Sequence, residues 1–214
     1  MDFVAPSVAV DAGSVRCLEA HVRNDGTEPC ELVFEVSGAA GWTFLHPEEC
    51  AVGPGEDATV GVFFKPLAGP VPTAGVHPVG LRASCRSNPE LSATGEATVE
   101  VRPYSDVVAV LDPVHGRDQR VCDYTLRLEN QGNVGMRARL YAAADAPREL
   151  ALDVQPTEVT AGPGETVKAT VHVEARKPLR KGERRFPICV RAQVEGGSEL
   201  RADGAFYQLG KKPR

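Results

Sequence analysis

The sequence lacks the residue patterns that most enzymes of known chemistry carry. It has no Gly-x-Ser-x-Gly turn to expose a nucleophilic serine, no His-Glu-x-x-His, and no phosphate-cradling loop that ends in Gly-Lys-Ser or Gly-Lys-Thr. Its five histidines are scattered along the chain. These absences favour a protein that binds over one that catalyses. No cofactor and no small-molecule substrate is indicated.

Metal-ligand spacing is almost as scarce. The one dense stretch is His46-Pro47-Glu48-Glu49-Cys50, which places four candidate ligands within five residues. A zinc site would need a fixed tetrahedral set and further ligands from elsewhere in the chain. We expect Glu48 and Glu49 to face solvent on a turn, and we predict no metal site.

The cysteines lack paired spacing. The nearest two are 13 residues apart, so no Cys-x-x-Cys exists, and none recurs at the same position of the repeat described below. In a reducing compartment such residues are small buried hydrophobes or free surface thiols. We predict that all six are reduced: Cys17, Cys30, Cys50, Cys85, Cys122 and Cys189.

Aromatic residues make up only 6% of the chain, and Trp42 is the only tryptophan. An exposed tryptophan could stack on a sugar ring, whereas β-sandwiches often bury one between their sheets. So few aromatics leave little for a sugar-binding platform. We predict that Trp42 is a structural residue of the core.

Long apolar runs are missing as well. No stretch approaches the roughly 18 apolar residues that a membrane span needs. The start, Met1-Asp2-Phe3-Val4, has neither the basic residues nor the apolar run of a secretory signal. The sequence therefore predicts a soluble, cytoplasmic chain.

The sequence does contain an internal repeat, in which one unit occurs twice. The turn Gly53-Pro54-Gly55-Glu56 returns as Gly162-Pro163-Gly164-Glu165, an offset of 109 residues, while Asn24-Asp25-Gly26 returns as Asn130-Gln131-Gly132 at an offset of 106. A period near 109 indicates tandem globular domains, because solenoid repeats are about 20–50 residues long. We place the domains at residues 1–103 and 104–214.

Each copy reads as seven short strands with frequent turns and no convincing helix. The stretch 18–23 alternates apolar and polar residues, as does 124–129, and this alternation is typical of half-buried strands. Evenly spaced short strands predict an all-β fold of two tandem immunoglobulin-like antiparallel β-sandwiches. The predicted core includes Trp42, Leu18, Val22, Val33, Leu81, Leu126, Leu128 and Val190.

The order of turn residues resembles bacterial immunoglobulin-like domains of the kind called NPCBM-associated. The residues that carry the resemblance are Asn24, Gly26, Gly41, Trp42, Pro47, Pro54, Gly55, Glu56, Pro78, Leu81 and Arg82. The two-domain arrangement is also similar to actinobacterial proteins often labelled "hydrolytic protein", although no hydrolytic site is evident. The resemblance implies an accessory carbohydrate-binding module as an alternative function. It also implies a place in a larger bacterial assembly, such as a phage-tail-like machine, and relatives that continue into a membrane-spanning helix.

Charge separates the two copies. Residues 1–103 carry 14 Asp and Glu against 6 Lys and Arg, whereas residues 104–214 carry 15 against 18. In this topology the loop before the sixth strand and the end of the seventh lie at the same pole. We predict that nine cations gather there: Arg176, Lys177, Arg180, Lys181, Arg184, Arg185, Lys211, Lys212 and Arg214.

These observations predict a non-catalytic adaptor. Its basic pole would face an anionic membrane surface, the inner leaflet, or stay solvated without a ligand. The acidic first domain would meet a protein partner. Nucleic acid is not expected, because the acidic domain would repel it and no aromatic residues interleave with the cations.

Overall fold

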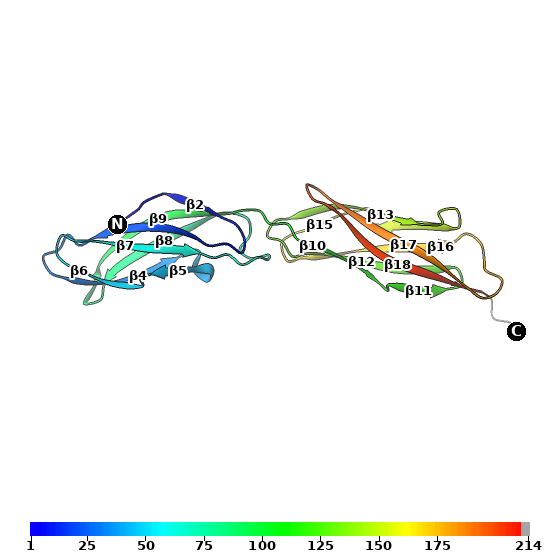
Figure 1. Ribbon diagram of the computed structural model, residues 1–214, viewed down its shortest axis with the longest axis horizontal. Coiled ribbons are helices and arrows are strands. Elements are labelled where there is room, and N and C mark those ends of the chain that lie inside the picture. Colours follow the sequence, from blue (N-terminus) through cyan, green and yellow to red (C-terminus); the bar gives the residue numbers. More distant parts are fainter. Residues whose placement is uncertain (211–214) are drawn as a thin grey trace. The chain divides into compact units, whose positions relative to one another are not determined.

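The computed structural model describes residues 1–210, which form two compact units. The first unit is Met1–Tyr104 and the second begins at Ser105. Figure 1 shows that each unit consists of strands arranged in two layers. Each unit is described by itself below.

The described residues of the first unit contain nine strands, which form a four-stranded and a five-stranded sheet. The sheet orders are β1-β3-β7-β5 and β2-β9-β8-β4-β6, and every pair is antiparallel except β2 with β9. The strands are β1 (Asp2–Phe3), β2 (Ser7–Val10), β3 (Arg16–Arg23), β4 (Cys30–Ser37), β5 (Thr43–His46), β6 (Glu49–Val52), β7 (Asp57–Phe64), β8 (Gly75–Cys85) and β9 (Asn88–Val101). A three-residue 3-10 turn, η1 (Ala40–Trp42), precedes β5.

The second unit repeats this topology strand for strand. Its sheets have the orders β10-β12-β16-β14 and β11-β18-β17-β13-β15, with β11 parallel to β18. The strands are β10 (Val107–Asp112), β11 (His115–Asp118), β12 (Val121–Asn130), β13 (Met136–Ala144), β14 (Leu150–Gln155), β15 (Glu158–Ala161), β16 (Thr166–Ala175), β17 (Glu183–Val194) and β18 (Glu199–Leu209). The predicted fold class, two tandem immunoglobulin-like β-sandwiches, is confirmed.

Alternation along the strands builds a separate core in each unit. In β3 every second residue points inward, so Leu18, Ala20 and Val22 are buried while their neighbours face solvent. Leu81 on β8 joins them, and Leu126, Leu128 and Val190 are buried in the second unit. The two clusters of buried residues share no member.

The inward placement of Val33 was wrong. Leu32 and Phe34 face the core of the first unit, and Val33 is only half-buried. Glu31 and Glu35 share the phase of Val33 on β4, and a sheet face that carries two carboxylates must lie outward. Apolar residues fall on both faces of β4, so the sequence alone did not show which face is buried.

The repeated turn motifs connect the same strands in both units. The side-chain amide of Asn24 donates to the carbonyls of Glu28 and Val52, and that of Asn130 donates to the equivalent carbonyls of Val134 and Ala161. Gly55 and Gly164 both have φ angles in the left-handed region, +72° and +75°, which explains glycine at this point of the Pro-Gly-Glu turn. The sequence repeat thus records one hydrogen-bonded turn cluster used twice.

Among residues 1–210 no helix is long and apolar enough to cross a membrane.

Candidate functional site

The basic loop lies between β16 and β17 of the second unit, where the end of β18 also arrives. Glu183 pairs with Leu209, and the N–H of Gly210 donates to the carbonyl of Gly182 at 2.8 Å. The loop and the last described residue of the chain therefore lie beside each other. Lys211, Lys212 and Arg214 follow Gly210 but lie outside the described residues.

A buried glutamine fixes the loop to the sandwich. Gln208 on β18 is only 3% exposed, and its side-chain amide donates to the carbonyls of Lys177 (2.8 Å) and Gln119 (3.1 Å). The N–H of Arg176 donates to the carbonyl of Glu149 at 2.8 Å. Nothing in the sequence around Gln208 marked it as an anchor, because its partners are main-chain groups distant in the chain.

Three carboxylates of this end are paired with arginines, whereas Asp118, opposite Gln208 on β11, accepts hydrogen bonds from the N–H groups of Arg120 and Val121. Glu149 forms a two-point ion pair with Arg184, whose guanidinium also lies 4.7 Å from the centre of the Phe186 ring. Glu183 pairs with Arg117 at 3.5 Å. Glu174 pairs with Arg120 at 2.9 Å. Glu149, Glu174 and Glu183 are therefore already engaged and offset the remaining cations of the loop only weakly.

Five of the six loop cations have no ion-pair partner among the described residues. Arg184 is the exception, because Glu149 holds it as part of the structure. The other five are exposed: Arg176, Lys177, Arg180, Lys181 and Arg185. The structure thus brings together a cluster of free positive charge on an anchored loop, and it removes Arg184 from the residues available to an anionic ligand.

Trp42 packs at the edge of the first core. The ring is half-buried and lies 5.9 Å from Phe64 and 5.7 Å from His77, centre to centre. The exposed aromatic surface lies elsewhere: Phe44 on β5 is 47% exposed and stacks on Phe63 of β7, with ring centres 5.0 Å apart.

The prediction of six reduced cysteines was wrong, because Cys30 and Cys85 form a disulfide, with Cα atoms 5.8 Å apart. They are 55 residues apart in sequence, yet β4 pairs with β8 so that Cys85 lies opposite Leu32, two residues from Cys30 on the same face. Sequence spacing carries no information on such a diagonal cross-strand contact. Cys17, Cys50, Cys122 and Cys189 remain as thiols. Partial burial raises the pKa of the Cys50 thiol.

The candidate metal ligands do not converge. His46 and Glu48 are exposed, Glu49 pairs with Arg86, and Cys50 packs against the core. Residues 1–210 contain no group of three or more His, Cys, Asp or Glu placed to hold a metal ion. On the second unit His172 donates a hydrogen bond from Nδ1 to Asp123 at 2.6 Å, on an exposed sheet face.

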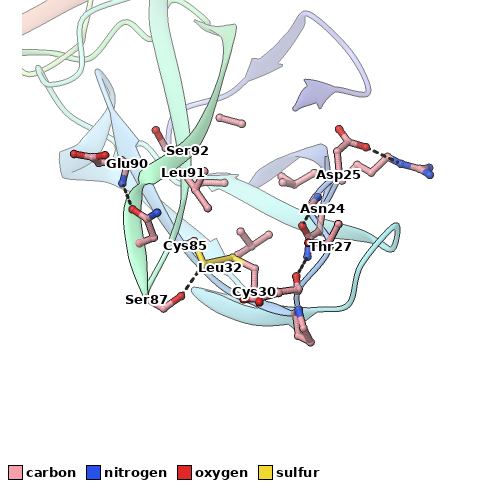
Figure 2. Close-up of a pocket in the computed structure, with 18 residues that line it drawn as sticks. Asn24, Asp25, Thr27, Cys30, Leu32, Cys85, Ser87, Glu90, Leu91 and Ser92 are labelled. Carbon is pink, nitrogen blue, oxygen red and sulfur yellow. Dashed lines mark hydrogen bonds and ion pairs between the residues drawn. A yellow bond between two sulfur atoms is a disulfide. The ribbon is translucent and has the colours of Figure 1, made fainter.

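A groove that the sequence did not reveal opens at one end of the first unit (Figure 2). Its volume is about 640 Å³, and it lies between the loop that follows β3 and the hairpin that joins β8 to β9. Leu32, Ala83 and the Cys30–Cys85 disulfide line it, with Leu91 and Ala93 from the hairpin. Leu91 is 63% exposed.

No protein-family model matches the chain, and no protein with a curated description matches it either.

Several solved structures are similar to the chain at low identity. The D00-D0 domain of intimin is 12% identical, with 94% of each chain covered and a TM-score of 0.40. Domains 4 and 5 of the S-layer protein SbsC are 15% identical over 69% of each chain, at 0.37. The Escherichia coli alpha-2-macroglobulin is 15% identical, covering 76% of this chain and 14% of its own, at 0.40.

Proposed function

We propose that this protein is a non-catalytic interaction module with two roles: the basic end of the second unit docks on an anionic membrane surface, and the acidic first unit binds a protein partner. The observation that carries the first role is the group of five unpaired cations on an anchored loop. Each Lys or Arg near an anionic leaflet contributes about 1 kcal/mol. Five such residues are enough for measurable, salt-sensitive association.

The anchored geometry favours a flat surface over a single small anion. The loop backbone is fixed at Lys177 by Gln208 and at Gly182 by Gly210, so the cations project from a defined platform. Nucleic acid is disfavoured, because no exposed aromatic side chain stands among the loop cations to stack on bases. The resemblance stated above adds a larger bacterial assembly as the setting we propose.

The test is co-sedimentation with vesicles of phosphatidylserine and phosphatidylcholine, compared with phosphatidylcholine alone, at low and moderate salt. We expect binding to the anionic vesicles only, and it should weaken as salt rises. A variant with Arg176, Arg180, Lys181 and Arg185 changed to Ser should lose it. Arg184 stays, because removing it would leave Glu149 unpaired.

A matched control separates position from overall charge. Arg16, Lys65, Arg82 and Lys168 are exposed cations outside the loop, and changing all four to Ser alters the net charge equally. This control should bind anionic vesicles as the unchanged protein does. Equal loss in both variants, or equal binding to neutral vesicles, would show that the loop is not the docking site.

A second candidate, accessory carbohydrate binding, has one observation in its favour. The stacked rings of Phe44 and Phe63 lie on the outer face of the β1-β3-β7-β5 sheet, where a sugar ring could stack. Phe44→Ala should then abolish retention on an immobilised glycan without lowering the melting temperature by more than a few degrees. Retention that is absent in the unchanged protein on a broad glycan set would remove this candidate.

A further inference from the structure

The first unit has a second groove, at the edge of the sandwich where strands β4 and β5 of different sheets come together (Figure 1). We call it the edge groove, and its volume is about 640 Å³. No Lys or Arg is among the residues that line it. The lining is apolar and acidic, with half-buried Val33, Val36 and Leu45 beside Glu35, Glu48 and Glu49.

Two of these carboxylates are not compensated by a cation. Glu49 pairs with Arg86, whereas Glu35 and Glu48 are exposed and have no ion-pair partner among residues 1–210. Arg82 lies opposite Glu35 in the register, yet its guanidinium donates hydrogen bonds to the start of β9 instead. The edge groove therefore offers free negative charge beside an apolar surface.

This negative charge belongs to the first unit and not to the framework that the two units share. The N–H of Phe34 donates to the carbonyl of Glu48, and in the second unit the N–H of Leu140 donates to the carbonyl of Thr157. Thr157 therefore occupies the position of Glu48, and the tyrosine that follows Leu140 occupies the position of Glu35. Neither free carboxylate has an acidic counterpart in the second unit.

The basic loop differs between the units in the opposite sense. In the second unit it carries the five cations that have no ion-pair partner among the described residues, and Leu179 lies half-buried among them. The equivalent stretch of the first unit, residues 65–76, carries one cation, Lys65. These two departures from the common framework have opposite charge, so the loop of the second unit is complementary to the edge groove of the first.

We propose that the edge groove receives the basic loop of a second copy of this chain. Arg180 and Lys181 of one copy face Glu35 and Glu48 of the next, while Leu179 meets the apolar lining. Because the two surfaces belong to different units, the contact is heterologous, and repeated contacts build an open row of copies unless they close into a ring. The inference names the partner of the first unit, so it rests on the protein-binding role proposed above.

Sedimentation velocity of the full-length protein at increasing concentration tests this contact. A contact this small is of the transient kind, so association should grow with protein concentration and fall as salt rises. Glu35→Lys combined with Glu48→Lys should weaken association at least about tenfold. The matched control combines Glu19→Lys with Glu96→Lys, which alters the net charge equally at exposed carboxylates elsewhere in the first unit. This control should associate as the unchanged protein does.

Mixing two variants identifies both surfaces. The Glu35→Lys, Glu48→Lys variant keeps its basic loop, and the four-serine loop variant described above keeps its edge groove. Each alone should stay monomeric. An equimolar mixture should form a one-to-one complex and nothing larger, because only one loop and one groove remain intact. No complex in the mixture, association of either variant alone, or equal loss of association in the control would overturn the proposal.

The outcome can be told apart from that of the membrane role, although one copy can use its loop for only one of the two contacts at a time. The Glu35→Lys, Glu48→Lys variant should still sediment with anionic vesicles, since its loop is unchanged. Self-association of the unchanged protein without vesicle binding refutes the membrane role alone. Vesicle binding without self-association refutes the contact between copies and leaves the membrane role in place.

Discussion

Cys30 and Cys85 illustrate what one cross-strand contact adds to a small domain. The disulfide joins β4 to β8 at the groove and closes a loop of 55 residues. Linking residues so far apart restricts the unfolded chain, and the usual gain is about 2–4 kcal/mol. The first unit therefore has a covalent constraint that the second lacks, since the counterparts of these cysteines are Met136 and Val194.

The thiol count tests this pairing directly. Titration of protein denatured without reductant should find four thiols, and six after reduction. A Cys30→Ala, Cys85→Ala double variant should also give four under either condition, and its first unit should lose about 2–4 kcal/mol of stability. A count of six in the unreduced protein would contradict the disulfide.

Trp42 should prove to be a packing residue. Its ring is half-buried against Phe64 and His77, so Trp42→Ala should cost about 3 kcal/mol, the lower end of the range for emptying an aromatic core site. Denaturant unfolding measures this. Phe44→Ala is the comparison, because that ring is 47% exposed and should cost only about 1 kcal/mol. Equal losses would contradict the placement of Trp42.

At the scale of elements, the Asn turn shows how one motif is used with different burial. Asn130 is 2% exposed and its amide donates to three carbonyls, those of Val134, Ala161 and Gly162. Asn24 is half-exposed and donates to two. Water can replace lost partners at Asn24 more readily than at Asn130.

We therefore expect unequal effects from the same substitution. Asn130→Ala should destabilise the second unit by about 3 kcal/mol, since it leaves buried carbonyls unsatisfied, whereas Asn24→Ala should cost the first unit about 1 kcal/mol. Unfolding of the two single variants measures the difference. A larger loss of stability from Asn24→Ala than from Asn130→Ala would contradict this difference in burial.

The elements also show what could be predicted from the sequence. Alternation in β3 and β12 and the repeated turns were enough for the fold class. Seven strands per copy were expected and nine are present, because β1 and β2 lie in different sheets although they are close in sequence, and because β6 is short and follows the His46-Pro47 turn. Strands this short are defined by their partners more than by their own residues.

The candidate sites divide in the same way. The basic loop could be predicted because its charged residues are read directly from the sequence. The topology of the fold then places the end of β18 beside it. The groove could not, since it depends on how the loop after β3 lies relative to the hairpin that joins β8 to β9. The anchoring of Lys177 by Gln208 was hidden for a similar reason: a side chain donates to main-chain carbonyls that could belong to any residue.

At the scale of the whole molecule, the two units have separate hydrophobic cores. They also differ covalently, because the Cys30–Cys85 disulfide lies in the first unit. The clusters of buried residues share no member, so each unit should unfold as its own cooperative step. The disulfide lies in the first unit, and the residues that remain as thiols in the second have no such partner. A reducing agent should therefore act on one step only.

Calorimetry of the full chain with and without reductant tests this. We expect two transitions, with reductant lowering the midpoint of one and leaving the other in place. Loss of about 2–4 kcal/mol from a domain of roughly 100 residues corresponds to a fall of at least about 8 °C, well above experimental error. Asn130→Ala identifies the second unit, since it should lower the transition that reductant does not move. A single transition, or a reductant shift in the step that Asn130→Ala also lowers, would show that the units are energetically coupled.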